Sequence, residues 1–209
     1  MTRRTAREPC RRTRWRCTSS STTPTSCSWR PTAWWRRGPN TRPGCCCPSS
    51  GDLKPTNVLL DDAEQPVLMD LGSMNRARIE VKGSRQAMAV QDWAAQRCTI
   101  SYRAPELFTV ESDCVIDERT DIWSLGCVLY CMMFGEGPFD MVFQKGDSVA
   151  LAVQNQLRVP PTGRYSASLE HLLSSMMVVN PQERPHVSQI LDQLEGLQPA
   201  LRGQATTRI

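Results

Sequence analysis

An abrupt change of composition at Gly51 constrains this 209-residue chain more than any other feature of its sequence. Apart from Met1, residues 1–50 contain no Leu, Ile, Val, Met, Phe or Tyr. Ordering fifty residues costs on the order of 50–100 kcal/mol in backbone entropy, and four Trp side chains with little else to bury do not offset that cost. We therefore expect residues 1–50 to be disordered and the folded domain to lie within residues 51–209.

The net charge changes sign at the same place. Residues 1–50 carry eleven Arg against one acidic residue, a net charge of +10, whereas residues 51–209 carry fourteen basic and twenty acidic residues, a net charge of −6. An Arg- and Trp-rich segment could bind nucleic acid through phosphate attraction and base stacking. Charge runs are more often merely solvated, so we expect nonspecific affinity for polyanions and no specific nucleic-acid function.

The cysteines indicate neither a zinc site nor a disulfide framework. Six of the ten lie in residues 1–50 without a C-x-x-C pair, and the chain has only two His. No apolar segment follows the N-terminal arginines, as it would in a secretory signal. No stretch approaches the roughly 18–20 apolar residues needed to cross a bilayer. A soluble, cytoplasmic protein is therefore expected.

Downstream of Gly51, the apolar pattern predicts a small hairpin followed by helices. Two aliphatic runs at 58–60 and 67–69 flank a turn-rich segment, which is typical of a β-hairpin. A short helix is predicted over 86–95. A second helix over 120–134 is expected to be buried all round, because both of its faces are apolar.

Shorter helices are predicted towards the C-terminus. Asp147 is expected to cap a helix that runs to Val153, and an amphipathic helix is expected to begin near Ser166 or Ser168. Pro185 suits the first position of the last helix, since it needs no backbone donor there.

Two polar motifs flank the predicted hairpin, D-L-K-P-T-N at 52–57 and D-L-G at 70–72. Phosphoryl transfer needs a carboxylate to orient the attacking hydroxyl, oxygen ligands for Mg²⁺ and positive charge beside the moving phosphoryl group. Mg²⁺ prefers one or two carboxylates together with phosphate and water. Asp and Asn also favour turns, so each acidic or amide residue taken alone could be structural. Taken together, the two motifs supply the groups that such a reaction requires, and the hairpin would bring them side by side.

From residue 52 onward the chain resembles protein kinases. The two motifs are followed by three more in the family's order: C-T-I-S-Y-R-A-P-E at 98–106, D-I-W-S-L-G at 121–126 and N-P-Q-E-R-P at 180–185. These resemble the end of an activation segment, the central helix of the large lobe and the turn before the last helix. Five motifs in order are specific, whereas a lone D-x-G would not be.

Further details of the resemblance indicate a subgroup and a fold. Lys54, two residues after Asp52, and Thr99, before the A-P-E motif, are typical of serine/threonine kinases. Leu71 in place of the usual Phe and the insert at 91–98 are similar to the Numb-associated kinase family. The resemblance implies an α+β protein-kinase fold, mostly its α-helical C-terminal lobe with a small β-hairpin. It also implies transfer of the ATP γ-phosphate to Ser or Thr of a protein substrate.

The resemblance implies a role for each matching residue. Asp52 would accept the hydroxyl proton, Lys54 would steady the γ-phosphate, and Thr99 would hydrogen-bond near both, although it could be an ordinary loop threonine. Asn57 and Asp70 would bind Mg²⁺, and with Lys54 they would hold ATP. Three structural residues are also implied, namely Asp121 beneath the catalytic loop and a buried ion pair between Glu106 and Arg184.

The chain departs from the kinase pattern just before Asp52. Ser50 and Gly51 stand where the family has His and Arg, and residues 1–50 contain only two Gly and no Lys. Neither a glycine-rich phosphate loop nor the Lys of the Lys–Glu pair is found there. Our hypothesis is that residues 1–50 are GC-rich coding sequence read in a shifted frame, joined to a partial kinase domain at 51–209. We expect this chain to be inactive; the alternative is a catalytically dead fragment that acts as an interaction module.

Membrane association follows from the resemblance alone. It implies an N-terminal lipid anchor and a Golgi or perinuclear location. Thr2 stands where myristoylation requires Gly. The sequence therefore argues against that anchor.

Overall fold

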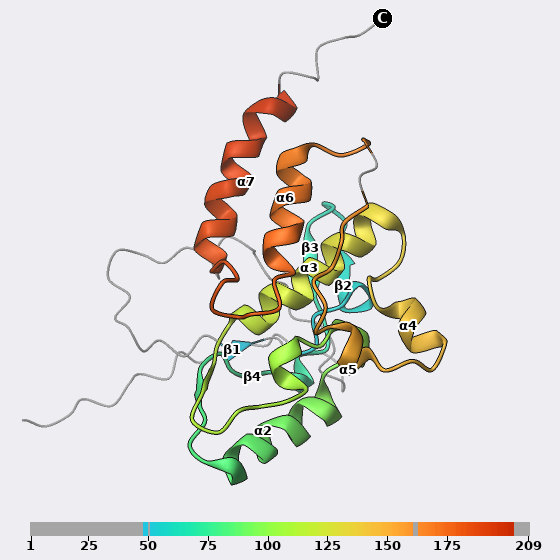
Figure 1. The fold of residues 1–209 in the computed structure, drawn as a ribbon. Helices are drawn as coiled ribbons and strands as arrows, with labels where there is room; N and C mark the ends of the chain where they lie inside the picture. Colours follow the sequence, from blue (N-terminus) through green and yellow to red (C-terminus); the bar gives the residue numbers. More distant parts are fainter. Residues whose placement is uncertain (1–47, 50, 161–162, 203–209) are drawn as a thin grey trace, which may run out of the picture.

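The computed structural model describes residues 48–49, 51–160 and 163–202 (Figure 1). The predicted disorder of residues 1–50 therefore falls on a segment that lies outside the described residues, except for 48–49. Within the described part, helices dominate and the strands form small pairs, so the expectation of a mostly helical kinase lobe is confirmed. Among the described residues, no helix combines the length and the apolar character needed to cross a membrane.

The described strands form three antiparallel pairs. The predicted hairpin is confirmed: β2 (Val58–Leu60) pairs with β3 (Pro66–Leu68). The Asp61 carboxylate closes its turn by accepting from the backbone N–H groups of Ala63 and Gln65, at 2.9 and 2.8 Å. The other pairs join β1 (Pro48–Ser49) to β4 (Asn75–Arg76), and β5 (Ile79–Glu80) to β6 (Val115–Ile116).

Short 3₁₀ turns carry the motifs between these strands and the helices. In chain order they are η1 (Pro55–Asn57), η2 (Leu71–Ser73), η3 (Ile100–Tyr102) and η4 (Pro105–Leu107). The first two flank the β2–β3 hairpin. The last two belong to the A-P-E segment, so all four place motif residues on loops rather than inside regular helices.

The helix α3 (Arg119–Phe134) runs through the middle of the molecule, with α6 (Ala167–Met176) against it (Figure 1). The two helices meet closely at Gly126, where an added Cβ would lie 3.2 Å from the Cβ of Met176 at the end of α6 and 2.7 Å from the sulfur of the following Met177. Trp123 of α3 is fully buried. The prediction of burial all round is wrong, however, because the Met132 side chain is 76% exposed.

Two predicted helix starts can be compared with the structure. Ser166 caps α6, because its hydroxyl accepts from the backbone N–H of Leu169. The prediction for Asp147 is wrong, since Ser148 caps α5 (Val149–Ala152). The Asp147 N–H donates to the Val142 carbonyl at 3.1 Å, so this residue still belongs to the turn that ends α4 (Asp140–Gln144).

The last helix, α7 (Val187–Arg202), begins two residues later than predicted. Pro185 is not its first residue. The His186 carbonyl accepts from the Gln189 and Ile190 N–H groups, and the His186 N–H donates to the Gln189 side chain at 2.8 Å. A side-chain acceptor three residues inside a helix satisfies a terminal donor, which places the start of the helix after His186.

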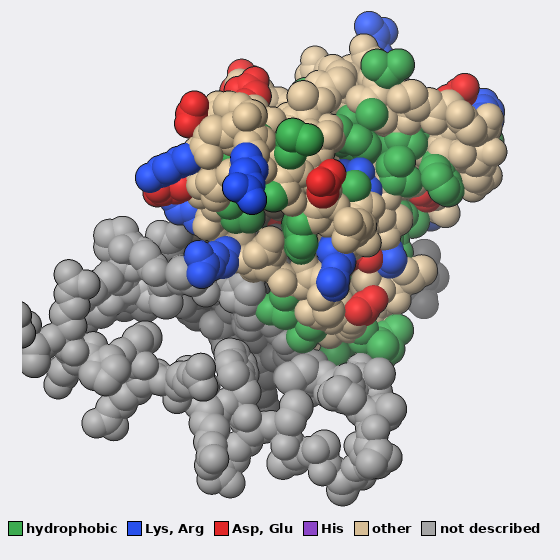
Figure 2. Space-filling view, turned by 90° about the horizontal axis from the view of Figure 1, so that it is seen from below, with side chains coloured by type: hydrophobic (Ala, Val, Ile, Leu, Met, Phe, Trp, Pro, Cys, Tyr) green, Lys and Arg blue, Asp and Glu red, His purple; other side chains and the backbone are tan. Residues whose placement is uncertain are grey.

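The predicted short helix at 86–95 is confirmed and is longer than expected. This helix, α2 (Ser84–Arg97), buries Ala87, Val90 and Ala94 against the rest of the domain. It lies at the lower edge of Figure 1, below β1 and β4. Figure 2 views the molecule from that side and shows Lys and Arg side chains spread among acidic and apolar ones. The helix therefore has one packed face and one solvent-exposed face of mixed character, on which Arg85 and Asp92 lie beside Met88, 65% exposed.

Candidate active site

The Asp52 carboxylate is held by a ring of three hydrogen bonds. Lys54 Nζ lies 2.8 Å from Asp52 Oδ2, and the backbone N–H of Thr99 donates to Asp52 Oδ1 at 2.7 Å. Lys54 Nζ also donates to Thr99 Oγ1 at 2.8 Å, which closes the ring. Residues 45 positions apart in sequence are thus brought together, and the structure groups all three residues expected to be catalytic.

These contacts set the charge of Asp52. Burial raises the pKa of its carboxyl, but hydrogen bonds from Lys54 and Thr99 and the positive charge of Lys54 outweigh burial and hold the pKa below its ordinary value. The carboxylate is therefore ionised at neutral pH. Oδ2 also accepts from Asn57 Nδ2 at 3.4 Å, and the second lone pair of Oδ1 can still accept a hydrogen bond from a hydroxyl group.

This shift predicts how stability depends on pH. A carboxyl whose pKa is lower in the folded than in the unfolded state stabilises the fold above its unfolded value, about 3.9, and loses that contribution as the pH falls through the folded value. We expect the difference in unfolding free energy between the wild type and Asp52→Asn to be constant above about pH 5 and to shrink below about pH 4. Urea unfolding at several pH values measures it, and parallel curves down to about pH 3 would contradict the assignment.

The β2–β3 hairpin returns the chain to Asn57 just before Asp70, the second expected metal ligand. The Met69 N–H donates to the Asn57 carbonyl at 2.8 Å, which ties the start of the D-L-G motif to the catalytic loop. The Asn57 side-chain Nδ2 donates to the Asp52 carbonyl oxygen at 2.9 Å. Asp70 is exposed and lies in the left-handed region, with φ 53° and ψ 62°.

The donor chemistry at this place fits Mg²⁺. Because Asn57 uses its Nδ2 as a donor to Asp52, its amide oxygen is directed elsewhere and accepts no hydrogen bond from the described residues. Asp70 adds one exposed carboxylate. An amide oxygen and a carboxylate are hard ligands that leave room for phosphate oxygens and water, as Mg²⁺ requires. No larger cluster of His, Cys, Asp and Glu that could enclose a metal occurs among the described residues.

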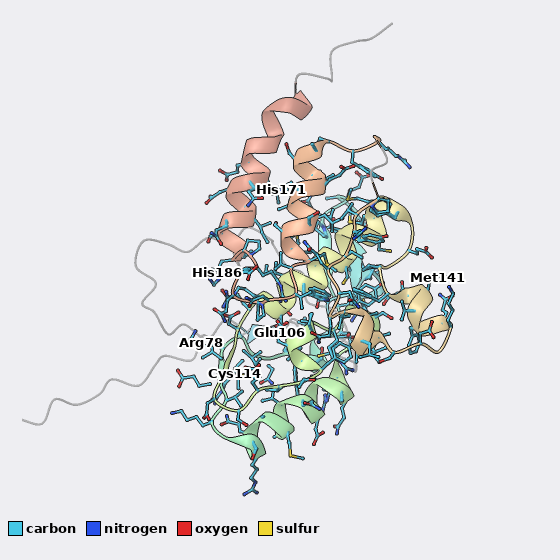
Figure 3. All side chains as sticks on the ribbon, in the orientation of Figure 1. Arg78, Glu106, Cys114, Met141, His171 and His186 are labelled. Carbon is cyan, nitrogen blue, oxygen red and sulfur yellow. The ribbon has the colours of Figure 1, made fainter. Side chains whose placement is uncertain are left out.

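Arg184 and Glu106 form a buried, bidentate ion pair. Arg184 Nη1 and Nη2 donate to the two carboxylate oxygens of Glu106 at 2.8 and 3.1 Å. The other guanidinium N–H groups donate to the carbonyls of Arg119, Val178 and Val179, so all five donors are used. The guanidinium also lies over the Trp123 ring, 5.3 Å from its centroid. Figure 3 shows Glu106 near the middle of the molecule, between α2 and α3, so the pair joins the A-P-E segment to the core.

A cleft beside Asp52 is lined by residues of the D-L-K-P-T-N segment and of the helices α2 and α3. Asp121, in the first turn of α3, lines it together with Trp93 and Cys98. Burial raises the pKa of the Cys98 thiol to about 12, so this cysteine is protonated and is not a candidate nucleophile.

Sequence reasoning missed three residues at this place. Gly51 has φ +73°, and a Cβ there would collide with the Ser73 carbonyl oxygen and lie 3.3 Å from Trp93 Cη2. Arg97 Nη1 donates to the Gly72 carbonyl at 3.1 Å. The spacing of Trp93 and Arg97, four residues apart in the insert, could have indicated that both lie on one helical face.

Comparison with known proteins agrees with this geometry. The protein kinase domain family matches residues 51–194. Serine/threonine-protein kinase 16 of Mus musculus is 74% identical over 158 residues, which cover 76% of this chain and 52% of that protein. The Homo sapiens protein of the same name is 73% identical over 158 residues, which again cover 76% of this chain and 52% of that protein. Serine/threonine-protein kinase ppk13 of Schizosaccharomyces pombe is 39% identical over 147 residues, covering 69% of this chain and 43% of that kinase.

The chain spans about half the length of the curated relatives it matches. The matched region contains the ring around Asp52, the D-L-G motif and the buried ion pair described above. The fold, the motifs and the relatives all support one assignment: the chain belongs to the protein kinase family, among its serine/threonine kinases.

Proposed function

We propose that residues 51–209 provide the acceptor-activating and metal-binding part of a site that transfers the γ-phosphate of ATP to a Ser or Thr hydroxyl of a protein. The observation that carries the proposal is the ring formed by Asp52, Lys54 and Thr99, with contacts of 2.7–2.8 Å. A carboxylate fixed in this way, ionised and next to a single cation, suits the orientation of an attacking hydroxyl.

The chemistry of each residue follows from the ring. The substrate hydroxyl donates to the Asp52 carboxylate, its oxygen forms the new bond to the γ-phosphorus, and the bond between that phosphorus and the ADP oxygen breaks. The hydroxyl proton passes to Asp52. Lys54 places positive charge beside the transferred group, and Thr99 holds both side chains in position. Mg²⁺ bound by Asn57 and Asp70 would neutralise negative charge on the phosphates.

We also propose that the 209-residue polypeptide does not perform this transfer unaided. Its first lysine is Lys54, and residues 1–50 hold only two glycines. Kinase chemistry also requires a second lysine, on a strand above the nucleotide, paired with a Glu. The acceptor-activating part therefore needs a complementary region that covers ATP.

The test is a chimera in which residues 1–50 are replaced by the part of the mouse relative that precedes its matched region. With ATP and Mg²⁺ we expect phosphoserine or phosphothreonine on a general protein substrate from the chimera, and none above background from the 209-residue polypeptide. Mass spectrometry of the substrate measures both. An active 209-residue polypeptide would refute the need for a complementary region, and an inactive but folded chimera would refute the kinase proposal.

Exposed apolar side chains favour one second candidate, an interaction module without catalysis. Leu60 of β2 is 69% exposed and Met132 of α3 is 76% exposed. Contiguous exposed apolar patches mark contact surfaces, and Leu59, beside Leu60, is also 49% exposed. A folded but inactive chimera would leave this candidate standing.

A further inference from the structure

One face of α2 lies against both halves of the candidate active site. Trp93 and Arg97 are four residues apart, so they point to the same side of the helix. The Trp93 ring lies against Gly51, the residue before Asp52, and Arg97 donates to the carbonyl of Gly72. Two segments that each carry a candidate functional carboxylate are therefore contacted by neighbouring side chains of one helix.

We propose that Trp93 and Arg97 are positioning residues, through which α2 fixes the catalytic loop at Gly51 and the magnesium motif at Gly72. The proposal rests on the proposed function, because Asp52 and Asp70 are the groups being positioned. Neither Trp93 nor Arg97 touches the reacting atoms. Their effect passes through the backbone of Gly51 and Gly72.

The conformation of Asp70 explains why such support is needed. The left-handed region is less favourable than the right-handed one for residues with a side chain, although Asp enters it more readily than most, and Asp70 has φ 53°. The following turn closes with one bond, in which the Met74 N–H donates to the Leu71 carbonyl at 3.2 Å, the upper end of the usual range. Gly72 lies inside this turn, between Leu71 and Met74. The Arg97 guanidinium, which is not part of the turn, donates to the Gly72 carbonyl and so fixes it.

The backbone at Gly51 is contacted by the other residue of this helix face, Trp93. With φ +73° and the Ser73 carbonyl at its Cα, this position has no room for a side chain, so residue 51 itself cannot anchor the loop. The Trp93 ring lies at the same place, with Cη2 3.3 Å from where a Cβ of residue 51 would stand, and it lines the cleft beside Asp52. Support that residue 51 cannot give is thus supplied by a side chain from the insert.

The direct test is hydrogen exchange in the 209-residue polypeptide without nucleotide. In Arg97→Met we expect the amides of 70–74 to exchange about fivefold faster, which is the loss of one hydrogen bond. Arg85→Met removes an exposed arginine from the first turn of the same helix and should leave that exchange unchanged. Trp93→Phe should speed exchange at 51–53. Equal exchange rates at 70–74 in the Arg97 and Arg85 variants would overturn the proposal.

A second measurement separates positioning from general stability. In the chimera, Arg97→Met should raise the Mg²⁺ concentration for half-maximal activity about fivefold with a small change in kcat, and Arg97→Lys should restore part of the loss. Unchanged Mg²⁺ dependence in an active chimera would overturn the role of Arg97. Faster exchange together with an inactive, folded chimera would support the positioning role and refute the kinase function, so the two failures are distinguishable.

Discussion

Replacing Arg184 by Met is expected to lower the free energy of unfolding by about 3–5 kcal/mol, because it leaves a buried charge without its partner. The change removes five hydrogen bonds at once and strands the Glu106 carboxylate in the interior. It also leaves the carbonyls of Arg119, Val178 and Val179 without this donor. Urea unfolding followed by circular dichroism measures the loss.

Two further variants make the Arg184 result specific. Arg158→Met removes an exposed arginine and should change stability by less than about 0.5 kcal/mol. Arg184→Lys keeps the charge but cannot reproduce the planar, bidentate contact, so an intermediate loss is expected. If Arg184→Met and Arg158→Met were equally stable, the ion pair would not hold the A-P-E segment to the core.

Replacing Asp52 by Asn in the chimera is expected to reduce kcat by about 10²–10⁴-fold, the usual contribution of a proton acceptor. Asn keeps an oxygen that can accept from the Thr99 N–H, whereas its amide nitrogen cannot accept from Lys54 and the negative charge is lost. Initial rates at saturating ATP and Mg²⁺ measure the effect. Asp62→Asn, in the exposed turn of the hairpin, is the matched control and should retain full activity.

A smaller loss would change the assignment of Asp52. If the Asn variant kept more than about a tenth of the activity while remaining folded, the carboxylate would not act as the proton acceptor. Lys54 and Thr99 would then be the groups to examine, because they share the same ring. Thermal unfolding of each variant separates this outcome from simple loss of structure.

The parts of the fold that the sequence predicted depend on local signals. The hairpin follows from aliphatic runs around the turn at Asp61, and α6 follows from its apolar period and the Ser166 cap. The grouping of the three candidate site residues around Asp52 could be predicted for a different reason. Motif order places Asp52, Lys54 and Thr99 in a known arrangement even though 45 residues separate the last two.

The misses arise where two local signals compete or where tertiary contacts decide. Asp147 and Ser148 both suit a helix cap, and the bond from the Asp147 N–H to the Val142 carbonyl assigns Asp147 to the preceding turn. Pro185 suits a first helical position, but the Gln189 side chain satisfies the donor at His186 instead. No local pattern shows which of two apolar helix faces is covered.

The contacts of α2 with the candidate active site could not be predicted from the sequence either, because tertiary packing decides which surface a helix face covers. Helix spacing places Trp93 and Arg97 on one face, but nothing in the sequence says that this face lies on Gly51 and Gly72. Likewise, the sequence shows Gly51 only as the absence of the Arg side chain that the kinase family has at this position. The structure shows that the neighbouring Ser73 carbonyl leaves no room for one.

The bond from Thr99 to Asp52 has a consequence for how the site tolerates change. Its donor is a main-chain N–H, which every residue except proline supplies. Substitutions at position 99 can therefore alter the hydroxyl that meets Lys54 without releasing the carboxylate. A mutational scan of this codon should separate the two effects. Proline would remove the main-chain donor and leave Asp52 held by Lys54, whereas the other residues would keep that donor and change only the side-chain contacts with Lys54 and Asp52.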